Sequence, residues 1–321
     1  MILDEALENA LMIEYLGDIF NVKGDNSDMV QDRVRRGTAA MVSIEAIMTD
    51  LCLGTHTFNV YLLLYQSLFL STMLFNSQAW SNVSKKDIEN LQTCQLKMLK
   101  KITGGTKSTS NAFTFLELGV LPISYEIHKR QLSFLHHILN LDDSDPVKKM
   151  YYNMKQLPGE KNWYNCVVNL LETYNIVMSE EEIKVKSKDA FKRIVKNAIR
   201  KVALTNLIQE CSQQKKTNTL VYTKLKPQDY LTKLFPWQSK LIFRCRSKTL
   251  DIKTHQTYKY SDKLCRWCNI WDEDLSHIIN CGEEVLEIPE LRNMEVLDKR
   301  MVTRISRITY RIQDFLEKVD Y

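Results

Sequence analysis

Glycine and proline are scarce in this chain, with only 9 glycines and 6 prolines among 321 residues. A sheet protein with many turns needs more of both, and the apolar residues here recur mostly at three- and four-residue spacing. Because 44% of the residues are apolar and 26% are charged, the chain can bury a core and is not a disordered tail. The composition therefore predicts a mainly α protein.

The marks of a secreted protein are also missing. Acidic residues Asp4, Glu5 and Glu8 stand where a signal peptide would carry positive charge. Eight cysteines spread over a chain of this length do not make a dense disulfide framework. We therefore expect a reduced, intracellular protein, either nuclear or cytoplasmic.

One apolar run, from Phe58 to Phe75, raises the question of a membrane span. Polar residues such as Asn59 and Gln66 interrupt it, and it has no flanking basic cluster. We favour a buried helix and expect no membrane partner; a span remains the alternative.

Charge is distributed very unevenly along the sequence. Residues 1–50 hold 4 basic and 10 acidic side chains, and residues 51–183 hold 12 of each sign. Residues 184–267 hold 21 basic against 5 acidic, a net charge of +16, whereas residues 268–321 hold 7 against 12. A long positive block attracts polyanions, so RNA or DNA is the expected partner. The alternative is a solvated helix face coated with lysines.

Within the positive block, the segment from Lys184 to Val202 has helical periodicity. Its expected apolar face consists of Phe191, Ile194, Val195, Ala198 and Val202. The basic ridge, at successive four-residue steps on another face, consists of Lys188, Lys192, Lys196 and Arg200. Like charges at this spacing destabilise an isolated helix, so the ridge predicts contacts with phosphates.

A second basic group follows, in which cations alternate with aromatic residues. The candidate nucleic-acid contacts are Arg244, Arg246, Lys248 and Lys253. The interleaved aromatic residues are Phe243, Tyr258 and Tyr260. Aromatic rings beside cations are typical of surfaces that stack exposed bases, although packing of these rings in the core is an equal alternative.

The clearest motif is C-x2-C-x8-H-x3-C, formed by Cys265, Cys268, His277 and Cys281. The first pair can aim two thiolates at one point, and the second pair shares one face if its segment is helical. Four protein ligands fill a tetrahedral zinc site and leave no position for a catalytic water, so the motif predicts structural zinc. The alternative is buried thiols with an unrelated histidine.

Several motifs together resemble the C-terminal region of non-LTR retrotransposon reverse transcriptases, in patches over about residues 11–285. Outside the Cys/His motif, the most specific is the stretch FLELGVLPI at 115–123, close to the family's Leu-Glu-Leu-Gly-x-Leu-Pro motif. The others are Tyr15-Leu16-Gly17, a Gly24-Asp25 turn, helices around 31–48 and 88–102, Gln78-Ala79-Trp80, Lys129-Arg130 with the run 135–139, and the Cys/His motif with the basic segment before it. Phe75-Asn76-Ser77 departs from the family pattern.

The resemblance implies three consecutive regions. Residues 1–140 would form a palm-edge remnant and a helical thumb-like domain, residues 141–250 a basic helical connector, and residues 251–321 a zinc knuckle with a C-terminal helix. In the parent enzymes these regions hold template RNA and the primer duplex. The implied partners are RNA or DNA, with other retroelement proteins as further candidates.

The residues that the family uses for catalysis are missing. Reverse transcription needs a set of carboxylates that hold two Mg²⁺ ions, and Asp142-Asp143 reads instead as a polar loop. Pro289-Glu290 with Asp298-Lys299-Arg300 is only a faint likeness to the nuclease elements of some relatives. We therefore expect a nucleic-acid-binding protein without enzyme activity; the alternatives are a protein-interaction scaffold and a non-functional retroelement fragment.

Overall fold

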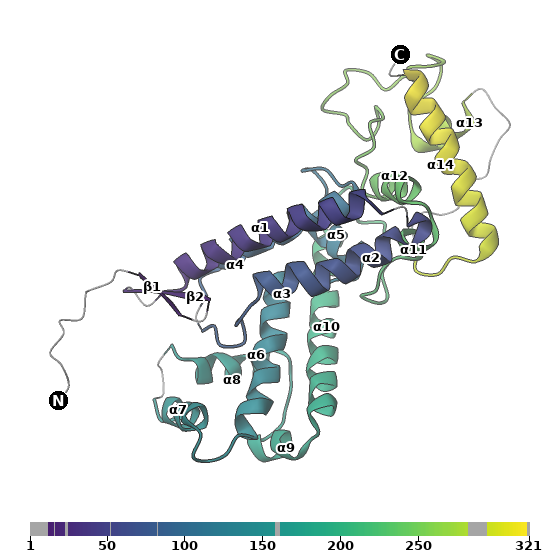
Figure 1. Cartoon of the computed structure of the whole chain (residues 1–321). Coiled ribbons are helices and arrows are strands. Elements are labelled where there is room, and N and C mark those ends of the chain that lie inside the picture. The colour runs from purple at the N-terminus through teal and green to yellow at the C-terminus, as the bar shows by residue number, and fades with distance from the viewer. Residues whose placement is uncertain are drawn as a thin grey trace. The chain divides into compact units, whose positions relative to one another are not determined.

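The computed structural model describes residues 12–319 apart from residues 16, 23–24, 52, 82, 158–160 and 282–293. It is mainly helical, as the composition predicts, with one small antiparallel sheet of β1 (Met12–Tyr15) and β2 (Asp18–Asn21) (Figure 1). Leu16, Gly24, Pro289 and Glu290, which belong to expected motifs, lie outside the described residues.

The chain divides into two compact units, each assembled from three separate segments. Unit 1 comprises residues 1–43, 66–95 and 122–202, and unit 2 comprises residues 44–65, 96–121 and 203–321. These limits do not coincide with the three consecutive regions expected from the resemblance. The α-helices that contribute residues to both units are α1 (Ser27–Thr49), α4 (Lys85–Thr103) and α10 (Lys188–Ser212).

Unit 1 is built around α6 (Ile123–Leu139), which contacts three shorter helices. These are α7 (Pro146–Lys155), α8 (Trp163–Thr173) and α9 (Glu180–Val185). These helices begin at residues whose side-chain oxygens accept hydrogen bonds, because the backbone N–H groups of a first turn have no partner within the helix. Asp145 accepts from Val147 N, and Ser179 forms a capping box with Glu182. The ring of His136 on α6 stacks on Phe191 of α10, with centroids 5.6 Å apart.

Unit 2 contains the Cys/His motif and several α-helices that lie wholly within it. These helices are α2 (Thr57–Leu64), α5 (Asn111–Leu118), α11 (Asp229–Lys233), α12 (Pro236–Arg246), α13 (Leu275–Asn280) and α14 (Lys299–Val319). A buried cluster joins α12, α13 and α14, and its members include Leu241, Ile278 and Ile308. The Cys/His motif is therefore attached to a packed helical core.

The apolar run from Phe58 to Phe75 is helical, as predicted, but it is not one regular helix. It passes from α2 through a π-helical turn (Tyr65–Phe69) into α3 (Leu70–Met73). Within this run Phe69 and Met73 are buried, while Gln66 faces solvent. No helix among the described residues is both long and apolar enough to span a bilayer.

The Leu-Glu-Leu-Gly motif lies in α5 and organises the interior of unit 2. Glu117 and Arg246 form an ion pair at 2.7 Å, and both side chains are fully buried. The hydroxyls of Tyr222 and Tyr230 donate to the same carboxylate. Burial alone lowers the pKa of Arg246, but the Glu117 carboxylate outweighs it and raises the pKa above its usual value. The expectation that Arg246 contacts nucleic acid is therefore wrong, because its guanidinium is enclosed by protein.

Candidate metal centre and basic surface

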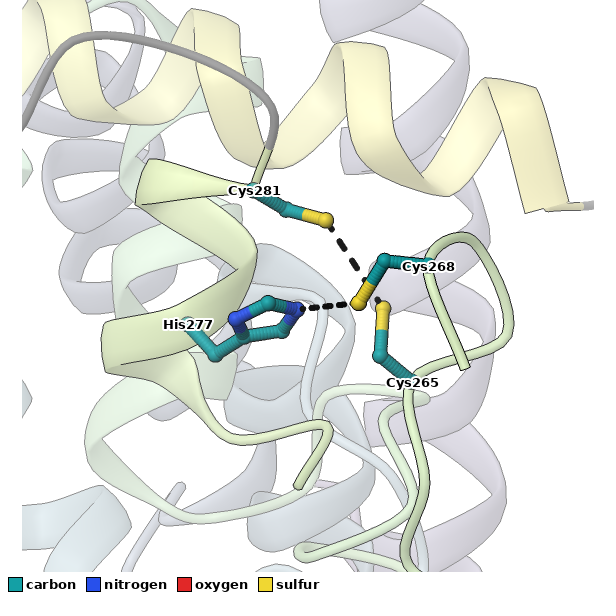
Figure 2. A group of neighbouring side chains, drawn as sticks. All are labelled: Cys265, Cys268, His277 and Cys281. Carbon is teal, nitrogen blue, oxygen red and sulfur yellow. Dashed lines mark hydrogen bonds between the residues drawn. The ribbon is translucent and has the colours of Figure 1, made fainter. Parts of the chain in front are cut away.

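The four residues of the Cys/His motif converge on one point of unit 2 (Figure 2). Their ligand atoms all lie within 4.8 Å of one another, and Cys265 is buried whereas the other three are half-buried. Cys265 Sγ is 3.9 Å from Cys281 Sγ, and Cys268 Sγ is 3.2 Å from His277 Nε2. Tetrahedral zinc with bonds of about 2.0–2.3 Å separates its ligand atoms by roughly 3.5–3.8 Å. The group could therefore hold a metal ion.

A short hairpin presents the first two thiols. Leu264 and Asp272 form an antiparallel bridge, and Cys265 N donates to Trp271 O at 2.7 Å. The turn closes through Asn269, which has a left-handed φ of 53° and donates its N–H to Cys265 O at 2.9 Å. Asparagine tolerates this conformation better than most residues, so the local sequence favours the turn that holds Cys265 and Cys268 together.

The other two residues are positioned by α13, so the condition under which they would share one face, a helical segment, is met up to Asn280. Asp274 begins the helix by accepting a hydrogen bond from His277 N at 2.8 Å. Cys281 caps its C-terminal end, four residues after His277. This spacing brings both side chains to one face.

The thiols of the cluster differ in acidity. Burial opposes ionisation of Cys268, but hydrogen bonds from the backbone of Trp271 and Ile270 outweigh it and lower the pKa of Cys268 to about 6. Burial and the neighbouring Cys265 raise the pKa of Cys281 to about 12. A cation supplies the missing counter-charge for several thiolates in one small volume, so the donor set suits a metal that binds thiolates.

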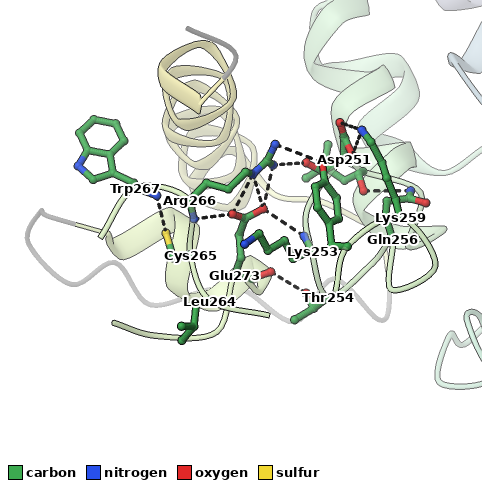
Figure 3. Close-up of polar contacts among 12 residues, drawn as sticks. Asp251, Lys253, Thr254, Gln256, Lys259, Leu264, Cys265, Arg266, Trp267 and Glu273 are labelled. Atoms are coloured by element: carbon green, nitrogen blue, oxygen red, sulfur yellow. Dashed lines mark hydrogen bonds and ion pairs between the residues drawn. The ribbon is translucent and has the colours of Figure 1, made fainter. Parts of the chain in front are cut away.

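The hairpin is held in place by a buried carboxylate that the motif does not reveal (Figure 3). Glu273 is fully buried and pairs with Arg266 at 2.8 Å. Its oxygens also accept from the backbone N–H of Arg266 at 2.8 Å and of Lys253 at 3.1 Å. Arg266 in turn donates to Asp251 O at 2.7 Å. These bonds fix the 251–254 segment against the hairpin that carries Cys265 and Cys268.

The ridge lysines lie on the exposed side of α10, as predicted. Lys188, Lys192 and Lys196 are exposed, and none of them forms an ion pair within the described part of the chain. Arg200 is half-buried, and burial lowers its pKa. The fully exposed part of the predicted ridge therefore consists of the three lysines.

The apolar face of α10 is rotated slightly from the expected one. Phe191 and Val195 are buried as predicted, and Ile199, which the expected face omitted, is buried too. The residues that were expected in the core but are only half-buried are Ile194, Ala198 and Val202. Burial thus follows a four-residue step along α10.

The three lysines line a surface cavity of about 700 Å³ in unit 1. The side of this cavity that α6 forms contributes Lys129, Arg130, Ser133, Phe134 and His137. Arg130 also donates to Leu74 O at 2.7 Å, and burial lowers its pKa. The Lys129-Arg130 pair appears in the family-like motif, but its place opposite the ridge depends on the packing of α6 with α10. The cations of two helices therefore face one hollow.

The remaining predicted contacts are scattered over unit 2. Arg244 is exposed and donates from Nε to Gly104 O at 2.8 Å. Lys248 is half-buried with a φ of 51°, and Lys253 pairs with Asp262 at 2.7 Å while 11% of its side chain is exposed. Phe243 belongs to the core and has no free face for a base. None of these residues lines the hollow of unit 1.

Comparison of the chain with family models, with curated proteins and with solved structures gives no match. The resemblance to non-LTR retrotransposon reverse transcriptases therefore stays a prediction from the motifs.

Proposed function

We propose that this protein binds nucleic acid, RNA or DNA, through phosphate contacts on the basic hollow formed by α6 and α10. The observation that supports this most directly is the convergence of Lys188, Lys192 and Lys196 with Lys129 and Arg130 around one cavity. Lys129 is paired with Glu126, but the three ridge lysines stand at four-residue steps and repel one another, and a polyanion relieves that repulsion and releases its own counterions. The half-buried ring of Phe134 in the same hollow offers a surface on which a base can stack.

In this proposal the Cys/His cluster holds structural zinc. Three thiolates and one imidazole suit zinc better than a hard cation, and four protein ligands close the coordination sphere. Zinc would fasten α13 to the hairpin, because Cys265 and Cys268 come from the hairpin and His277 and Cys281 from α13 and its end. The zinc would therefore stabilise the folded structure of this segment.

We also propose that the protein descends from a retroelement reverse transcriptase and does not itself make DNA. No set of three carboxylates with metal-ligand geometry is present among the described residues. Other retroelement proteins are further candidate partners, and either a nuclear or a cytoplasmic location suits the proposal.

Affinity measurements with two charge-matched variants test the binding proposal. The ridge variant replaces Lys188, Lys192 and Lys196 with Gln; the control variant replaces the exposed Lys85, Lys86 and Lys149, which lie in unit 1 outside the hollow. Both lose three positive charges, and Gln keeps a similar helix propensity.

We expect the ridge variant to bind single-stranded RNA and DNA far more weakly than the control variant, by a similar factor for every sequence, because phosphates carry no base identity. Equal affinities of the two variants would contradict binding at the basic hollow and would favour the alternative function, a protein-interaction scaffold.

A further inference from the structure

A second surface cavity of unit 1, of about 560 Å³, has a different chemistry from the basic hollow. It lies between α4, α6 and α8. Its apolar lining consists of Val83, Ile88, Ile127 and Leu170. Its polar lining includes His128, Gln131, Asn162, Asn165 and Asn169. Apolar walls with a few convergent polar groups are typical of sites for small organic ligands.

Gln131 is the residue that points to a ligand. The residue is only 3% exposed, and its Nε2 donates to Trp80 O. Its Oε1 is buried and accepts no hydrogen bond from any described residue. A buried acceptor without a donor is unfavourable, so a ligand in the cavity that Gln131 lines would favour a rotation of this amide that lets the oxygen accept a hydrogen bond from it.

The lining of this cavity is close to electrically neutral. His128 Nδ1 lies 2.6 Å from the hydroxyl of Tyr174, and burial lowers the pKa of His128 to about 4. The imidazole is therefore uncharged at neutral pH. Among the described lining residues Lys161 alone is charged, and it is exposed to solvent.

We propose that this cavity binds a nucleobase, supplied either by a free nucleotide or by an unpaired position of a nucleic-acid strand. A nucleobase has an uncharged edge with both donors and acceptors, which amides such as those of Gln131, Asn165 and Asn169 can match. The two faces of the base suit the branched aliphatic walls. The positive charge of Lys161 favours a ligand that carries a phosphate over an uncharged ligand. The ridge lysines do not line this cavity, so the site stands independently of the basic hollow.

Calorimetric titration with a plugged variant tests the site. Asn169 is exposed on α8, and its amide makes no hydrogen bond within the described residues, so Asn169→Trp should fill the cavity without harming the fold. Asn153→Trp on α7 is the matched control, because Asn153 is also an exposed helical asparagine and lines none of the cavities described here. The probes are the four ribonucleoside 5′-monophosphates and a five-nucleotide single strand of mixed sequence.

We expect at least one probe to bind the wild type and the Asn153→Trp variant alike, and to lose tenfold or more of its affinity in Asn169→Trp. Loss with a monophosphate identifies a free nucleotide, and loss confined to the strand identifies an unpaired base. Gln131→Met should weaken the same probe about three- to tenfold, the effect of one neutral hydrogen bond. If Gln131→Met does not fold, the comparison of the two tryptophan variants decides alone.

Probes that do not bind, or that bind Asn169→Trp and Asn153→Trp equally, would overturn the nucleobase site. The ridge variant separates this failure from that of the proposed function: it should keep the Asn169-dependent affinity for a monophosphate even though its affinity for long strands falls.

Discussion

Cys265 connects the metal cluster to the interior of unit 2, since its side chain is buried among core residues of α12 and α14. Loss of a metal ligand should therefore loosen part of this core as well as the hairpin. We expect one zinc per chain in reduced wild-type protein, and much less zinc with a lower thermal stability in Cys268→Ser. Structural zinc contributes on the order of 10 kcal/mol in small modules, enough to decide whether a segment folds.

Metal analysis of purified protein measures this prediction, with Cys166→Ser as the control because Cys166 belongs to unit 1 and is not one of the four residues of the cluster. Wild-type protein without zinc, or equal zinc content in the wild type and in Cys268→Ser, would contradict zinc binding by the Cys/His cluster.

The Glu117–Arg246 pair is the second residue-scale feature with a measurable consequence. Glu117→Gln keeps the shape of the side chain but leaves the Arg246 guanidinium as a buried charge without its counter-ion, which destabilises proteins by about 3–5 kcal/mol. Asp314→Asn disrupts the exposed pair with Lys318 and should change the unfolding free energy by only about 0–1 kcal/mol. Urea denaturation compares the two; similar values would show that the buried pair contributes little.

The sequence was informative about single residues where the determinants are local. The cluster of Cys265, Cys268, His277 and Cys281 could be predicted because residue type and short spacing identify such a group. Arg246 could not be placed correctly, because its partner Glu117 lies 129 positions away and only tertiary packing brings the two together. Glu273 gives no signal of its own, since its burial depends on the folded hairpin.

At the scale of secondary-structure elements, Gly119 ends α5 with a left-handed φ of 63°. A Cβ added there would lie 2.1 Å from the backbone carbon of Lys226 and 2.4 Å from the nitrogen of Pro227. Glycine is therefore required twice, for the backbone conformation and for the close approach of the 226–228 segment, whose Gln228 N donates to Glu117 O.

Gly119→Ala should accordingly destabilise the protein far more than Gly54→Ala. Gly54 also has a positive φ, of 54°, but an added Cβ would have ordinary contact at 3.7 Å with Phe235, so only left-handed strain of roughly 1–2 kcal/mol applies there. Thermal unfolding of both variants measures the difference. Equal melting temperatures would mean that the 226–228 segment can move away without loss.

Periodicity predicted α10 and its exposed lysines, yet it could not identify the hollow. The side of α6 that faces α10 depends on contacts such as the stacking of His136 on Phe191, which a pattern within one helix does not contain. Ile199 belongs to the buried face for the same reason, because packing against neighbouring elements determines which side of α10 is covered.

At the scale of the whole molecule, the mainly α class followed from the composition, whereas the division into units did not. Blocks of charge and motif order suggested consecutive regions, but each compact unit collects three distant segments. The net charge of +16 in residues 184–267 is likewise divided at residue 202 between the two units. Charge counted along the chain therefore predicts a polyanion partner without locating its surface.

The salt dependence of binding tests the central claim, that phosphates lie on the basic hollow, most directly. For single strands the logarithm of affinity falls with the logarithm of salt concentration by about 0.7 per phosphate contact, so removing three contacts should flatten the slope by about 2. Fluorescence anisotropy with a labelled single strand, at several salt concentrations, should show this flattening in the Lys188, Lys192 and Lys196 variant. The charge-matched variant at Lys85, Lys86 and Lys149 should keep the wild-type slope, and identical slopes for all three proteins would contradict the claim.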